Sequence, residues 1–155
     1  MDRSRSSFKV RFDKLKREAT RALNVIGDIC DGVESLGSSS CFVGGAINMT
    51  VMAANGGKMP VVGVPKFESE THFSADEKTF LVGLSDWMKI NIDPKDVVTL
   101  FLAYIAGVPT GRLAIASPGD ILIFSGRLIT AVAVFLKLST ALVKDLLNII
   151  GKRIA

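Results

Sequence analysis

The sequence is poor in the residues that most metal and nucleophilic centres use. Its 155 residues include one histidine, His72, and two cysteines, Cys30 and Cys41. These are too few for a zinc site built from cysteine and histidine, or for a framework of disulfides. We therefore expect two reduced thiols that pack against their neighbours.

Signatures of nucleotide binding and of acyl-transfer catalysis are also missing. No Gly-x-Ser-x-Gly motif occurs, and Gly56-Gly57-Lys58 lacks both the spacer between glycines and the Ser or Thr that a phosphate-binding loop requires. The sequence accordingly predicts no cofactor, and it favours a protein without catalytic activity over an enzyme.

Hydrophobic residues, in contrast, make up 48% of the chain, which is high for a soluble domain of this size. Such a composition indicates either a membrane-embedded protein or a soluble one with a large buried interface. No shift in composition divides the chain, so we expect a single domain over residues 1–155.

Basic residues are concentrated at the front. Eight of the 19 lysines and arginines lie in residues 1–22, against three acidic residues there. A basic amphipathic helix of this kind docks on lipid or on a protein partner, whereas nucleic acid is disfavoured because stacking aromatics are missing. The predicted membrane or partner contacts are Phe12, Lys14, Leu15 and Arg17 in this helix, and Gly44, Gly45, Arg127 and Lys137 further along the chain. Under the positive-inside rule this end is cytoplasmic.

Periodicity predicts two helices in the first third of the chain. Apolar residues at steps of three and four indicate an amphipathic helix over 8–36, within a front segment 1–37 that Gly37 and three serines terminate. An uncharged helix over 41–54 follows, in which Gly44 and Gly45 permit close backbone contact. At about 15 residues it is short for a bilayer span, which takes ~20.

The segment 55–117 is predicted to be a polar region of loops and short helices. Asn55, Gly56 and Gly57 end the preceding helix, and Pro60 cannot rejoin one. A capping box of Ser74 and Glu77 predicts a short helix that reaches Met88, and Asp93-Pro94 predicts another up to Val108.

A long apolar helix is predicted over 118–150. Ser117 is its N-cap, Pro118 follows Ser117 as the first helical residue, and Gly119-Asp120 place a carboxylate near the positive helix end. Its polar residues, which include Arg127 and Lys137, fall in one narrow stripe, and the other sides are apolar. A membrane-facing or deeply packed helix has this pattern.

One set of residues has metal-ligand chemistry. Glu68, Glu70 and His72 alternate along a segment expected to be extended, with Asp76 nearby. The spacing permits a divalent metal site, but an acidic loop with one ordinary histidine explains the same residues and is the favoured interpretation.

Several short motifs resemble those of a known family. They are Asn48, Asn55-Gly56-Gly57, Met59-Pro60-Val61, His72, Thr79, Leu81, Leu84, Asp86, Gly119-Asp120-Ile121-Leu122-Ile123 and Gly126. This pattern is similar to an uncharacterised family of small bacterial integral membrane proteins with a domain of unknown function. The resemblance implies two hydrophobic helices that bracket a polar region, and it implies no catalytic residue.

The sequence thus predicts an all-α, membrane-associated protein of the bacterial inner membrane, with a structural or accessory role. It would pack on lipid, on a larger assembly or on both, as part of a homo- or hetero-oligomer. The first alternative is a soluble subunit of a large multi-copy assembly, and the second is a metal-dependent enzyme that uses the His72 region.

Overall fold

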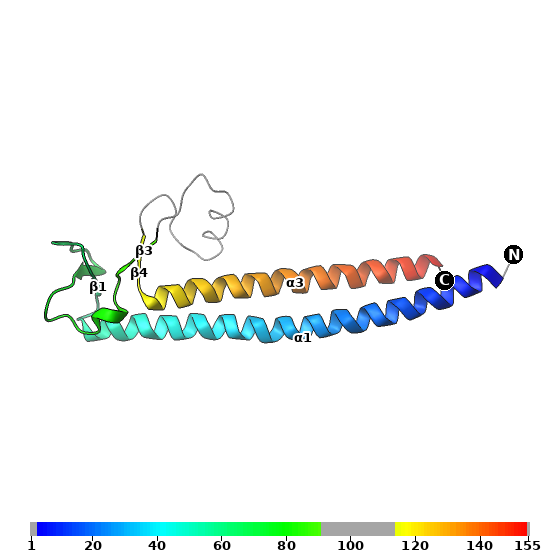
Figure 1. Cartoon of the computed structure of the whole chain (residues 1–155), viewed down its shortest axis with the longest axis horizontal. Coiled ribbons are helices and arrows are strands. Elements are labelled where there is room, and N and C mark those ends of the chain that lie inside the picture. Colours follow the sequence, from blue (N-terminus) through cyan, green and yellow to red (C-terminus); the bar gives the residue numbers. More distant parts are fainter. Residues whose placement is uncertain (1–2, 91–113, 155) are drawn as a thin grey trace. The chain divides into compact units, whose positions relative to one another are not determined.

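The described part of the protein consists mainly of two long helices. The computed structural model describes residues 3–90 and 114–154, with α1 at Arg3–Ala54 and α3 at Pro118–Ile154 (Figure 1). Among the described residues, only short strands and one 3₁₀ turn accompany them, and the all-α class is confirmed. The chain divides into two compact units. One is Ser35–Thr130, and the other combines Met1–Glu34 with Ala131–Ala155, so each helix contributes a segment to both units.

The predicted break at Gly37 to Ser40 is wrong, because α1 continues through it without interruption. Glycine and serine each weaken an isolated helix by up to about 1 kcal/mol, but tertiary packing overrides such local preferences. The uncharged helical segment is therefore longer than predicted, because residues 35–54 carry no charged side chain and are all helical. Twenty residues at 1.5 Å each give about 30 Å, the thickness of a bilayer core.

In the unit Ser35–Thr130, glycines bring the two helices into close contact. A β-carbon on Gly37 would lie 2.7 Å from the carbonyl oxygen of Gly126, and one on Gly119 would lie 2.6 Å from that of Gly44. Gly37 and Gly44 are seven residues apart on α1, and Gly119 and Gly126 are seven residues apart on α3. This heptad spacing keeps one side of each helix turned to an antiparallel partner. Gly44 therefore makes a close backbone contact within the chain, whereas Gly45 faces open space and makes none.

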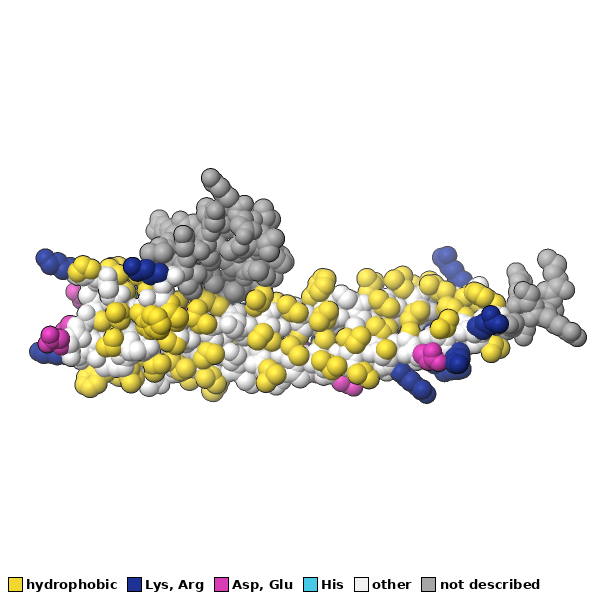
Figure 2. Space-filling model, viewed as in Figure 1, with side chains coloured by type: hydrophobic (Ala, Val, Ile, Leu, Met, Phe, Trp, Pro, Cys, Tyr) yellow, Lys and Arg dark blue, Asp and Glu magenta, His cyan; other side chains and the backbone are white. Residues whose placement is uncertain are grey.

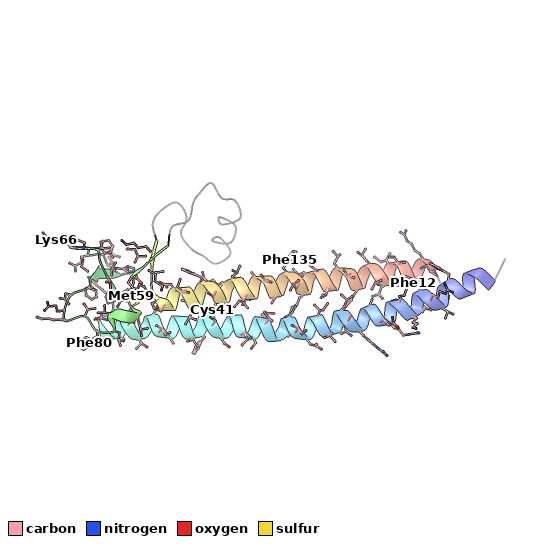
Figure 3. The ribbon with its side chains drawn as sticks, viewed as in Figure 1. Phe12, Cys41, Met59, Lys66, Phe80 and Phe135 are labelled. Atoms are coloured by element: carbon pink, nitrogen blue, oxygen red, sulfur yellow. The ribbon has the colours of Figure 1, made fainter. Side chains whose placement is uncertain are left out.

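Side-chain hydrogen bonds to backbone carbonyls also stabilise this contact between α1 and α3. Ser40 Oγ donates to the Leu122 carbonyl at 2.9 Å, and Cys41 Sγ to that of Ile123 at 3.4 Å. Cys41, labelled in Figure 3, thus lies on the side of α1 that faces α3. Small and polar side chains, in place of large apolar ones, hold these helix segments together.

In the other unit, residues 3–34 of α1 pack against residues 131–154 of α3. Cys30 and Ala133 are buried, and the side chains of Phe12 and Lys16 lie beside Gly151. Lys137 of α3 forms ion pairs with both Asp31 and Glu34 of α1. This contact combines small residues with charged side chains and the aromatic ring of Phe12.

Beyond α1 the chain forms two small sheets. Strand β1 (Met59–Val61) pairs in parallel with β2 (His72–Ser74), and Val61 also forms a bridge to Asp86. Strand β3 (Met88–Ile90) pairs antiparallel with β4 (Ala114–Ala116), which leads into α3.

The helix predicted from Ser74 to Met88 is wrong. Ser74 lies in β2 and donates to the Val64 carbonyl at 2.7 Å, so it does not cap a helix. Asp76 and Thr79 form a tight turn instead, and only the 3₁₀ turn η1 (Val82–Leu84) follows. The helix predicted up to Val108 lies outside the described residues.

Large apolar side chains of both helices point outward. Among the most exposed are Phe42 at 79% and Phe135 at 68%, and Figure 2 shows hydrophobic side chains spread over the visible face of both helices. Phe8–Ala54 and Pro118–Ile154 are both long and apolar enough to cross a membrane, and only 17% and 11% of their most apolar 18-residue windows are buried. The core helix of a soluble protein would be mostly buried.

Candidate functional site

A polar cluster of Asn48, Ser117 and Asp120 lies at the start of α3. Ser117 and Asp120 form the helix cap. Asp120 N donates to Ser117 Oγ and Ser117 N donates to Asp120 Oδ2, both at 3.0 Å. This is a reciprocal capping box, which satisfies backbone donors that an uncapped helix leaves free. The predicted N-cap is confirmed, and the predicted start at Pro118 matches α3, which continues to Ile154.

Asn48 of α1 ties the two helices together at this cap. Its Nδ2 donates to Asp120 Oδ1 at 2.7 Å, and its Oδ1 accepts from Ser117 Oγ at 2.7 Å. The Asn48 side-chain amide thus both donates to and accepts from the capping box of α3. Because Gly119 has no side chain, Asn48 can come close enough to make both bonds.

His72 and Asp86 form a second polar pair in the same unit. His72 Nε2 lies 3.3 Å from Asp86 Oδ2, and Thr71 Oγ1 lies 2.7 Å from His72 Nδ1. These contacts fit the tautomer in which Nε2–H donates to Asp86 and Nδ1 accepts from Thr71. Both ring nitrogens are then used.

Backbone pairing holds Asp86 in place. Asp86 N donates to the Pro60 carbonyl at 3.0 Å, and Val62 N donates to the Asp86 carbonyl at 2.8 Å. Since β1 pairs with β2 on its other edge, His72 and Asp86 are brought together through β1.

The Asp86 carboxyl lies in an unfavourable place for a negative charge. Its side chain is 6% exposed, and burial, with a smaller contribution from the nearby Asp120 carboxylate, raises its pKa from 3.8 to about 7. Oδ1 is buried and has no hydrogen-bond donor among the described residues. An orphaned buried oxygen of this kind is uncommon and calls for an explanation.

Asp86 also lines a hollow. The hollow has a volume of about 310 Å³, and its lining consists of Val61, Val64, Phe67, His72, Asp86 and Ile115. It therefore combines four apolar side chains with one acidic and one imidazole group. Small-molecule sites have this mixture of apolar walls and few polar groups.

Three of the four metal-ligand candidates are used in separate contacts. Glu68 pairs with Lys58 at 3.1 Å, His72 pairs with Asp86, and Asp76 accepts from Lys78 N in its turn. Glu70 is exposed. In the part of the chain that the structure describes, no three acidic, histidine or cysteine side chains are grouped as metal ligands.

The predicted lipid or partner contacts are partly inside the protein. Leu15 is 64% exposed and Lys14 pairs with Glu18 at 4.0 Å on the surface, whereas Phe12 lies beside Gly151 and Lys137 binds α1. Arg17 and Arg127 are exposed.

The predicted turn after α1 is observed. Gly56 and Gly57 have φ of 68° and 88°, the left-handed conformation that glycine adopts without strain. Asn55 does more than end the helix: its Nδ2 donates to the Val51 and Phe80 carbonyls, and its Oδ1 accepts from Phe80 N at 3.0 Å. Pro60 is fully buried, and its carbonyl accepts from Asp86.

Sequence reasoning did not find the pairing of His72 with Asp86 or that of Asn48 with the helix cap. Asn48, His72 and Asp86 all belong to the motifs that resemble a known family, and this resemblance is the available sequence signal for the two contacts. No local spacing reveals these contacts, because they join segments 14 and 72 residues apart.

Comparison with protein families matches residues 32–132 to a family of unknown function, DUF5317. The chain belongs to DUF5317. The region matched to DUF5317 closely follows the unit Ser35–Thr130, and it contains the polar cluster and the glycine contacts of this chain described above. No curated protein and no solved structure matches the chain.

Proposed function

We propose that this protein is a bacterial membrane protein in which α1 and α3 form an embedded helical hairpin that serves as a structural or accessory subunit of a larger membrane assembly. The observation that carries the proposal is the inverted distribution of its side chains. Glycine, serine, cysteine and asparagine lie between the helices, while large apolar residues point outward. Membrane helices pack through small and polar residues in this way, because lipid leaves no hydrophobic gain for burying leucine between them.

Charge supports an orientation with both termini cytoplasmic. The front of α1 is basic, and α3 ends with Lys152 and Arg153. Positively charged segments stay on the cytoplasmic side, so the polar region between the helices would lie on the other side of the inner membrane.

Fractionation of membranes from expressing cells tests the embedding. We expect carbonate and high salt to leave the protein in the membrane and detergent to extract it. A variant with Lys14, Lys16 and Arg17 changed to Gln removes the charges that could hold a peripheral protein, and it should stay in the membrane equally well. Release by carbonate would instead support a soluble subunit of a multi-copy assembly.

The accessory role can be tested separately by photocrosslinking in native membranes. A crosslinker at Leu138, which is 66% exposed, should capture a neighbouring protein. A crosslinker at Ala133, which is buried, serves as the matched control and should give only intramolecular products. Equal patterns at the two positions would count against a partner on the outer face of α3.

A further inference from the structure

The hollow beside Asp86 has the features of a binding site for a small ligand. Its lining comes from β1, from the loop between β1 and β2, from β2, from Asp86 just before β3, and from β4, and all of it lies within one unit. His72 has a side-chain exposure of 35%, so the hollow is reached from the surface. Its volume of about 310 Å³ is at the lower end of the range for ligand sites.

The charges around the hollow select the kind of ligand. Asp86 has one oxygen bonded to His72 and one without a donor among the described residues, and the Asp120 carboxylate lies nearby. Since both nitrogens of His72 have partners, the imidazole cannot supply the missing bond. A ligand in the hollow can supply a donor for this oxygen, and a positive charge on it would offset the two carboxylates.

The walls define the rest of the ligand. Val61, Val64, Phe67 and Ile115 offer only apolar surface, and Phe67 supplies an aromatic ring suited to a cation. We propose that this hollow binds a small organic ammonium ion with an apolar body, held by the Asp86 carboxylate. The proposal concerns the polar region alone and does not depend on membrane embedding.

A larger hollow nearby offers no comparable feature. It has a volume of about 520 Å³ and is lined by Lys58, Glu68 and five other residues, but these two charges pair with each other at 3.1 Å. The third charged group in its lining, Lys66, is a cation, so this hollow does not share the acidic character of the hollow beside Asp86.

The test uses the purified full chain and three probes of similar shape: benzylammonium, benzyl alcohol and benzoate. We expect calorimetry at pH 8 to detect binding of benzylammonium only. Asp86→Asn should weaken that binding at least tenfold, whereas Glu70→Gln, which removes an exposed charge from the same region, should leave it unchanged. Val64→Phe should also abolish binding, because it fills the hollow and leaves Asp86 in place.

The pH dependence provides an independent check. Binding of the cation requires the ionised carboxylate, so affinity should fall about tenfold per pH unit below pH 7 and level off above it. Absence of benzylammonium binding at millimolar concentration would overturn the proposal. Equal binding by the Asp86→Asn variant, or by benzyl alcohol, would overturn it as well.

Discussion

Gly44 of α1 and Gly119 of α3 face each other so closely that a methyl group on Gly119 would lie 2.6 Å from the Gly44 carbonyl oxygen. Backbone lies on both sides of this contact, so no flexible side chain can move to make room. The contact thus depends on the lack of a side chain at both positions.

Replacing Gly126 by Ala tests the second contact of this kind. The added methyl group would meet the Gly37 carbonyl oxygen and lie 2.6 Å from Cys41 Sγ, so it would push the helices apart, at a cost of about 1–3 kcal/mol. Unfolding in detergent micelles measures the loss. Gly45→Ala is the matched control, because nothing lies within 4 Å of that position, and it should stabilise the protein by roughly 0.5–1 kcal/mol. Similar effects of both changes would contradict the packing described here.

Asn48→Ala should destabilise the protein by about 1–3 kcal/mol, because it leaves Asp120 Oδ1 and Ser117 Oγ without their partner across the helix pair. Thr50→Ala, on the exposed side of the same helix, removes only a bond to its own helix and should cost much less. Thermal unfolding of the two variants gives the comparison. If they lose equal stability, the bonds of Asn48 contribute nothing specific.

Stability should fall as pH rises from 4 to 7. The pKa of Asp86 is raised in the folded protein, so the folded state binds the proton more tightly than the unfolded chain, and ionisation disfavours folding. The raised pKa corresponds to up to about 4 kcal/mol between the two pH limits. Asp86→Asn should remove most of this slope and be more stable than the parent at pH 8. His72 and Asp120 are the titratable side chains that lie near this carboxyl.

Lys137→Met should destabilise the unit it belongs to, because Asp31 and Glu34 lose their shared cation and repel each other. Adding Glu34→Gln removes that repulsion, and we expect the double variant to recover part of the stability. Lys14→Met, which breaks an exposed pair on one helix, is the control with little effect. A double variant that is less stable than Lys137→Met alone would argue against the ion pairs of Lys137.

The parts of the fold that could be predicted are those with local signals. Ser117 and Asp120 cap α3 as their spacing indicates, and Asn55, Gly56 and Gly57 end α1. The failures arise where distant contacts outweigh local ones. Gly37 resembles a helix end but is retained within α1, where its missing side chain admits α3. Ser74 resembles an N-cap, but its hydroxyl bonds the Val64 carbonyl.

The candidate site was less predictable than the fold. His72 was singled out for its acidic neighbours Glu68 and Glu70, yet its partner is Asp86, which follows 14 residues later and reaches it through strand pairing. Irregular segments have no periodicity from which such a contact could be derived. Membership of a family draws attention to these residues without saying which of them meet.

Strand β1 has only three residues, and it is paired on both edges. Its release would therefore separate His72 from Asp86 and dismantle the hollow in a single event, so the site exists as a whole or not at all. The Val62 amide, which donates to Asp86, would report that event by hydrogen exchange, at a rate set by the opening of β1 rather than by the melting of either helix.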